Sequence, residues 1–151
     1  TAPHSTNCER KMADFEPTLN AFVCNWCTDP AADLAGTSRL TQPPNVRMIR
    51  MMCTCMVDPK YVIKALLEGA DAVLISGCHP GDCHYINGNL KARRRVKLLK
   101  EIMPRFGFDE RRVKLTWIGA SEGIDFANTM KELVEEVKAL GPNEVRQQMV
   151  I

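Results

Sequence analysis

The chain has 151 residues, of which 45% are hydrophobic and 25% are charged, and its formal net charge is +2. This size fits a single domain with a hydrophobic core, and no apolar run approaches the roughly 20 residues that a membrane-spanning helix needs. The polar segment 1–17 lacks the apolar stretch of a secretory signal, so we expect a protein of the reducing cytoplasm without membrane contact.

Apolar runs typical of β-strands alternate four times with patterns typical of α-helices. In chain order, we predict a strand over 19–23, a helix over 31–38, a strand over 46–52, a helix between 58 and 69, a strand over 72–75, a helix over 89–103, a strand over 113–118 and a helix from 121 to 141.

Capping signals set several of these boundaries. Asp58 followed by Pro59 is typical of an N-cap and the first helical position, and Gly69 is typical of a helix end. Ser121, followed by Glu122, is predicted to cap the last helix. Four methionines in or beside the second strand are expected to pack in the core of the sheet: Met48, Met51, Met52 and Met56.

The alternation predicts an α/β fold, in which right-handed crossovers connect about four parallel strands into a small doubly wound sheet of the Rossmann or flavodoxin type. We assign residues 18–141 to this domain, residues 1–17 to a flexible N-terminal arm and residues 142–151 to a C-terminal tail. Ligands of such sheets bind beyond the carboxyl ends of the strands, so the residues that follow strands are candidates for a functional site.

Seven cysteines are the leading functional clue. In a reducing compartment, grouped cysteines are more often metal ligands or redox groups than disulfides, and the odd number argues against a paired scaffold. Cys24, Cys53 and Cys78 each follow a predicted strand, so we expect them to converge at the carboxyl ends of the strands. Cys8 and Cys55 are interpreted as spare thiols.

Two cysteine pairs have the spacing of metal ligands. Cys24 and Cys27 form a C-x2-C pair, and Cys78 and Cys83 form a C-x4-C pair further along the chain. Together they supply the four thiolates that a [2Fe–2S] or [4Fe–4S] cluster needs. Cys53 is an alternative ligand.

Other chemistries fit part of this pattern. Four thiolates also suit a structural zinc site, although the separation of the two pairs exceeds the usual zinc spacings. A C-x2-C pair after a strand is typical of a thioredoxin-like dithiol oxidoreductase, which would leave Cys78 and Cys83 unexplained. His79 or His84 could replace a cysteine ligand, as in a Rieske cluster. An iron–sulfur cluster with cysteine ligands accounts for most of the pattern.

Basic residues gather in the second half of the chain. The segment from Lys91 to Lys114 contains ten basic and three acidic residues. It shows neither the interleaved aromatic residues nor the helix-turn-helix pattern that would favour nucleic-acid binding. A solvated face is the default interpretation. As a function, we predict a docking face for an acidic protein partner, and no binding of nucleic acid.

Several segments of the sequence resemble one known family. They are FVCNWC at 22–27, ADLAG at 32–36, PNVR at 44–47, VDP at 57–59, GAD at 69–71, GCHPGDCHY at 77–85 and GNLK at 88–91. Together they resemble the delta subunit of the methyl-viologen-reducing, or F420-non-reducing, nickel–iron hydrogenases, from about Phe22 to the C-terminal helix. Cys55 stands where members of that family usually have a glycine.

The resemblance implies a non-catalytic subunit that carries one [2Fe–2S] cluster and passes electrons. The implied partners are the small and large subunits of a hydrogenase, or a formate dehydrogenase, and the FAD-containing subunit of heterodisulfide reductase. The resemblance further implies a hetero-oligomeric complex that performs flavin-based electron bifurcation in methanogenesis. The expected ligands remain Cys24, Cys27, Cys78 and Cys83, with Cys53 as the alternative.

Overall fold

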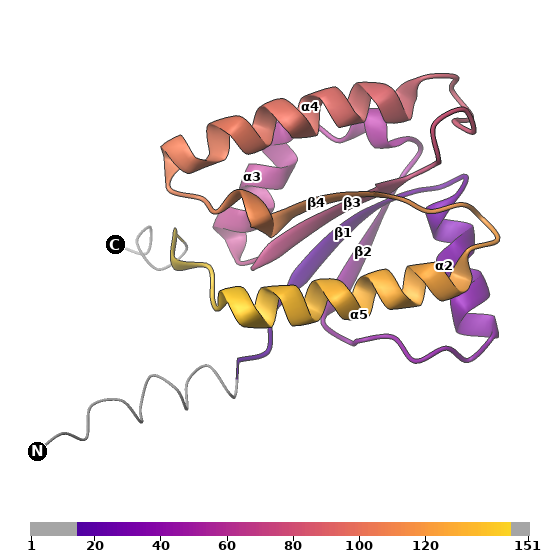
Figure 1. Ribbon diagram of the computed structural model, residues 1–151, viewed down its shortest axis with the longest axis horizontal. Coiled ribbons are helices and arrows are strands. Elements are labelled where there is room, and N and C mark those ends of the chain that lie inside the picture. The colour runs from indigo at the N-terminus through magenta and orange to yellow at the C-terminus, as the bar shows by residue number, and fades with distance from the viewer. Residues whose placement is uncertain (1–14, 146–151) are drawn as a thin grey trace, which may run out of the picture.

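The computed structural model describes residues 15–145, in which four parallel strands form one sheet with helices on both faces (Figure 1). The strands are β1 (Leu19–Cys24), β2 (Val46–Met51), β3 (Ala72–Gly77) and β4 (Val113–Trp117). The α-helices are α2 (Thr28–Thr37), α3 (Pro59–Glu68), α4 (Gly88–Ile102) and α5 (Gly123–Leu140). Short 3₁₀ helices are η1 (Thr54–Met56), η2 (Met103–Phe106) and η3 (Glu110–Arg112). The predicted α/β fold is confirmed.

The sheet is doubly wound. Its strand order is β2-β1-β3-β4, and every neighbouring pair is parallel. Helices α2 and α5 cover one face, and α3 and α4 cover the other (Figure 1). From β1 the chain winds outward to β2 on one side, and then to β3 and β4 on the other. β1 and β3 therefore flank the topological switch point, where ligands of such sheets bind.

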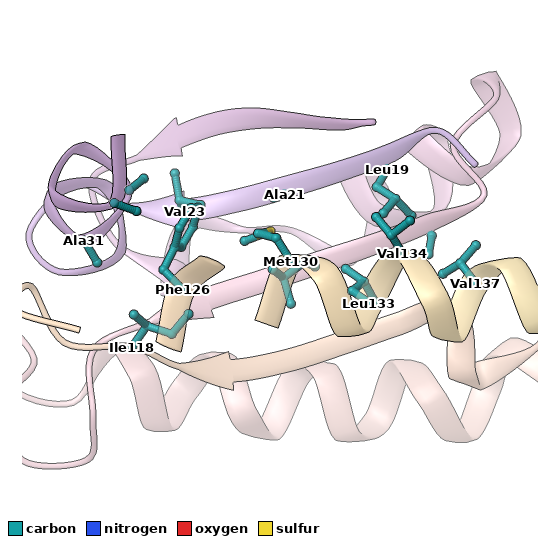
Figure 2. Packing of buried hydrophobic residues seen from close by; sticks show 14 residues of the cluster. Leu19, Ala21, Val23, Ala31, Ile118, Phe126, Met130, Leu133, Val134 and Val137 are labelled. Carbon is teal, nitrogen blue, oxygen red and sulfur yellow. The ribbon is translucent and has the colours of Figure 1, made fainter. Parts of the chain in front are cut away.

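The two central strands carry the core. Alternate residues of β1, namely Leu19, Ala21 and Val23, pack in one cluster with Phe126 and Met130 of α5 (Figure 2). All of β3 is buried, as expected of a parallel strand that helices cover on both faces. This packing fixes where β1 and β3 end, and hence where the residues that follow them lie.

Helix α3 begins and ends as predicted. The carboxylate of Asp58 accepts the backbone N–H of Lys60 at 2.9 Å, and Pro59 is the first helical residue. The helix stops at Gly69, whose φ of 128° is a backbone conformation that side chains with a Cβ rarely adopt. Local sequence signals are therefore sufficient to define this helix.

The predicted cap of α5 is wrong. Glu122, rather than Ser121, occupies the N-cap position, and the helix begins at Gly123. The carboxylate of Glu122 turns back, accepts the backbone N–H of Gly119 at 2.6 Å and pairs with His79 at 2.8 Å. These contacts hold the turn before the helix, and a capping hydroxyl is not used.

Strand β2 forms an edge of the sheet and is largely exposed. Met48, Met52 and Met56 are 48%, 51% and 53% exposed, whereas Met51 packs against the core. The prediction that these methionines fill the core is therefore wrong for three of the four. The reason is that the helices pack over β1 and β3 and leave the outer strand uncovered.

A buried polar network ties the amino ends of the strands. The carboxylate of Asp71, which precedes β3, accepts the backbone N–H of Thr18 at 2.9 Å and that of Asn143 at 3.0 Å. The guanidinium of Arg112 donates to the carbonyl oxygens of Asp71 and Gly141. The network joins the segments before β1, before β3 and after α5.

The two ends of the chain are only partly described. The predicted arm 1–17 and tail 142–151 both contain residues outside 15–145, and their boundaries stay predictions. In the described part of the chain, no helix is long and apolar enough to cross a membrane.

Candidate metal centre

Three buried thiols meet at the switch point of the sheet. Cys24 is the last residue of β1, Cys78 follows β3 directly, and Cys27 is the N-cap residue of α2. Their sulfur atoms all lie within 4.8 Å of one another, and the Sγ atoms of Cys24 and Cys78 are 3.7 Å apart. None of the three residues is more than 5% exposed. We call them the first thiol group.

The first thiol group fits a tetrahedral metal. Metal–thiolate bonds of about 2.3 Å place two sulfurs of a tetrahedral centre roughly 3.8 Å apart. The Sγ atoms of Cys24 and Cys78, 3.7 Å apart, match this separation. Thiolates are soft ligands that favour iron–sulfur clusters, zinc or copper(I). The residues present therefore fit the iron–sulfur cluster that the sequence predicts.

Three more cysteines form a second thiol group. Cys53 follows β2, Cys55 lies in η1, and Cys83 lies in the loop between β3 and α4. The Sγ atoms of Cys53 and Cys83 are 3.9 Å apart. All three sulfurs lie within 3.4 Å of the position that a Cβ on Gly88 would occupy. Cys8 lies outside the described residues.

The predicted ligands are divided between these two groups. Cys24, Cys27 and Cys78 form the first thiol group. Cys83 lies in the second group, together with the predicted alternative, Cys53. Both groups follow the carboxyl ends of strands, and each group combines sulfurs from different loops. Spacing along the chain predicts that Cys24 and Cys27 lie together, but not that Cys83 lies with Cys53 rather than with Cys78.

A thiolate is stabilised inside the first thiol group. A hydrogen bond from Cys27 to the sulfur of Cys24, with help from the backbone N–H of Trp26, lowers the pKa of Cys24 to about 6. The same contact raises the pKa of Cys27, which keeps the shared proton. Burial raises the pKa of Cys78. Because thiolates bind metals, Cys24 is the ligand that this group offers first at neutral pH.

The second thiol group meets the amino end of α4. Burial alone would raise the pKa of Cys83, but the backbone N–H groups of Asn89, Tyr85 and Gly88 outweigh it and lower that pKa. The positive end of the helix dipole acts in the same direction. Burial raises the pKa of Cys53 to about 12. Cys83 is therefore more readily a thiolate than Cys53.

Aromatic side chains connect the two cysteine loops near the surface. The ring of Trp26 stacks on that of His84 with centroids 3.8 Å apart, and Trp26 Nε1 donates to the hydroxyl oxygen of Tyr85 at 3.4 Å. The Nε2 atom of His79 lies 2.8 Å from Oε2 of Glu122. The Nε2 atom of His79 thus has a partner outside the thiol groups, and the ring of His84 is stacked on that of Trp26.

The cysteine pattern alone did not reveal two features of this site. Cys55, interpreted from the sequence as a spare thiol, lies with Cys53 and Cys83 around Gly88. Gly88 lies against all three sulfurs of the second group. The sequence does contain one sign of the contact at Gly88, namely the glycine that opens the GNLK segment at 88–91. A glycine at the start of a helix often marks a close approach of other atoms to the backbone.

The fold and the site together define the class of protein. This is a doubly wound α/β domain with a candidate thiolate metal centre at its switch point. The family model of the methyl-viologen-reducing hydrogenase, delta subunit, matches residues 19–141. The chain belongs to this family, and the resemblance seen in the sequence is confirmed.

Two similar proteins are named as iron–sulfur subunits. The F420-non-reducing hydrogenase vhc iron-sulfur subunit of Methanococcus voltae is 46% identical over 129 residues, which cover 85% of this chain and 90% of the relative. The F420-non-reducing hydrogenase iron-sulfur subunit of Archaeoglobus profundus is 46% identical over 129 residues, which cover 85% of this chain and 94% of the relative.

Another relative is a much longer protein. It is a subunit of the ferredoxin/F420H2-dependent CoB-CoM heterodisulfide reductase of Methanosarcina acetivorans, and it is 44% identical over 137 residues. These cover 89% of this chain but only 17% of the relative. In that protein, a region similar to this chain is therefore part of a much longer polypeptide.

Proposed function

We propose that this chain is a non-catalytic electron-transfer subunit of a hydrogenase linked to heterodisulfide reductase. A [2Fe–2S] cluster bound at the thiol groups would supply one-electron redox chemistry. The observation that carries the proposal is the first thiol group, three buried sulfurs at the switch point of the sheet. Membership of the delta-subunit family supports the same function.

We assign three ligands to the first thiol group and the fourth to the second. Cys24, Cys27 and Cys78 supply three thiolates, and Cys83 supplies the fourth. Cys83 is favoured because backbone N–H groups stabilise its thiolate, whereas burial raises the pKa of Cys53. Cys53 is the alternative fourth ligand, since its Sγ atom lies 3.9 Å from that of Cys83.

Exposed apolar side chains beside the thiol groups are the proposed partner face. Trp26, Met52, Tyr85 and Ile86 are 43%, 51%, 46% and 85% exposed. Aromatic and methionine side chains are enriched in protein interfaces. An electron relay must also bring its cluster close to the cofactors of its partners. A partner that covers these side chains would meet this requirement.

The proposed partners are a hydrogenase, or a formate dehydrogenase, as donor and the FAD-containing subunit of heterodisulfide reductase as acceptor. The relative from Methanosarcina acetivorans supports the acceptor, because there a similar region is part of a heterodisulfide reductase polypeptide. We place the chain in a cytoplasmic hetero-oligomer that performs flavin-based electron bifurcation.

The test follows electrons through the anaerobically purified complex. Hydrogen should produce the EPR signal of a reduced [2Fe–2S] cluster, and added heterodisulfide should remove it. A complex that contains Cys78→Ser should still reduce a dye at the hydrogenase but lose hydrogen-dependent heterodisulfide reduction. Undiminished heterodisulfide reduction by that complex would overturn the proposed relay.

A further inference from the structure

Asn89 joins α4 to the backbone beside the first thiol group. Its side chain is buried, and Nδ2 donates to the carbonyl oxygens of Cys78 at 2.9 Å and His79 at 2.8 Å. Its Oδ1 accepts the backbone N–H of Leu90 at 2.8 Å. A buried amide whose donors and acceptor are all used fixes the backbone that it binds. Asn89 thus holds the chain at the point where Cys78 leaves β3.

Because Gly88 has no side chain, it leaves space for the three sulfurs of the second thiol group. A Cβ on Gly88 would lie 2.3 Å from the Sγ atom of Cys53, and 3.3 Å and 3.4 Å from those of Cys83 and Cys55. The first distance is a steric overlap. The φ of Gly88 is not positive, so glycine is needed here for space rather than for conformation. Two turns along α4, Arg95 donates to the carbonyl oxygen of Cys55.

We infer that Gly88 and Asn89 are positioning residues of the candidate metal centre. Together, at the start of α4, they determine where the sulfurs of both thiol groups lie. Asn89 fixes the backbone of the first group, and Gly88 admits the sulfurs of the second. Because the two residues are adjacent in one helix, α4 also sets the distance between the groups. Their role toward a metal rests on the proposed function, whereas their role toward the thiols rests on the contacts alone.

Asn89→Asp tests the contact with the first group, because it keeps the side-chain size and removes both donors. In the metal-free full chain, the alkylation rate of Cys78 should rise about tenfold, while that of the partly buried Cys55 should change by less than about twofold. Mass spectrometry of the alkylated peptides measures the extent of alkylation at each cysteine separately. Asn128→Asp, at an exposed position of α5, is the control. An alkylation rate of Cys78 equal to that in the control would overturn the role of Asn89.

A double-mutant cycle tests the contact with the second group. Gly88→Ala is combined with Cys53→Ala, which removes the sulfur that the new methyl group would overlap. Gly88→Ala alone should lower Tm by about 5 °C or more, but by about 2 °C at most in the Cys53→Ala background. Gly36→Ala in α2 is the control, because its Cβ would meet no atom within 4 Å. Equal losses in both backgrounds would overturn the role of Gly88.

The metal-loaded chain supplies a second measurement. After anaerobic purification, both variants should lose iron or show shifted EPR signals and midpoint potentials, while the controls should match the parent chain. If the parent binds no iron, the proposed function fails, and the alkylation and unfolding results still decide the inference. If the parent binds iron and both variants match it in content, signal and potential, the inference fails and the proposed function stands.

Discussion

At the scale of single residues, Cys24 carries the charge of the first thiol group, because its pKa is lowered to about 6. We predict that Cys24→Ser reduces bound iron to less than about a tenth of the parent content, since a hydroxyl is a harder and weaker donor. Cys55→Ser is the matched control and should keep most of the iron. Iron and sulfide analysis of the anaerobically purified variants checks this. Equal losses in the two variants would contradict the ligand assignment.

Glu122 makes a pH-dependent contact beside the same site. The backbone N–H of Gly119, and then the imidazole of His79, lower its pKa. A carboxylate with a lowered pKa in the folded chain adds stability that is present above the unfolded-state pKa. This stability is lost as the pH falls through the lowered, folded-state value.

We therefore predict that Glu122→Gln lowers the Tm of the metal-free chain by about 2 °C at neutral pH. The difference should shrink below about pH 4, where the carboxylate of the parent chain also becomes protonated. Thermal unfolding over a pH series measures it, with the exposed Glu132→Gln as control. A difference that grows as the pH falls would contradict this interpretation.

At the scale of elements, the type and order of the predicted strands and helices agree with the structure. Continuous apolar runs suffice for β1 and β3, because parallel strands covered on both faces are apolar throughout. The run of β2 is interrupted by Arg47 and Arg50, but its methionines were still expected in the core, and Met48 is about half exposed. Which strand forms an edge depends on the winding of the whole chain, and local patterns do not contain this information.

The grouping of the cysteines has the same explanation. Spacing predicts contacts within a loop, such as Cys24 with Cys27. The structure brings Cys24 and Cys27 together and adds contacts between different loops, Cys24 with Cys78 and Cys53 with Cys83. These contacts arise because parallel strands end at one edge of the sheet. The sequence was therefore sufficient to predict the location of the site, but not the division into two groups.

The network around Asp71 offers a test of stability away from the thiols. Asp71→Ala removes the acceptor of two backbone N–H groups, those of Thr18 and Asn143, and should cost about 2 to 4 kcal/mol of unfolding free energy. Bound iron per folded chain should not change, because Asp71 and Cys78 lie at opposite ends of β3. Urea unfolding measures the cost. The exposed Asp33→Ala should stay within about 0.5 kcal/mol of the parent, and an equally small cost for Asp71→Ala would contradict the role of the network.

At the scale of the whole molecule, α4 carries exposed basic residues and begins directly after the loop that holds Tyr85 and Ile86 of the proposed partner face. Arg94 and Lys97 are exposed on α4, whose amino end meets the second thiol group. We predict that reversing both charges to Glu weakens binding to the partner complex severalfold, and more strongly at low salt, because exposed charges mainly orient association. Co-purification at two ionic strengths measures this. Unchanged assembly at both would show that these basic residues are only solvated.

Metal and sulfide analysis combined with EPR most directly tests whether the two thiol groups hold a [2Fe–2S] cluster. We predict about two irons and two acid-labile sulfides per chain in anaerobically purified protein, with a spin-one-half EPR signal after reduction. Zinc uses the same thiolate donors without sulfide and without redox activity. One zinc per chain, with neither iron nor sulfide, would therefore contradict the proposed electron-transfer function.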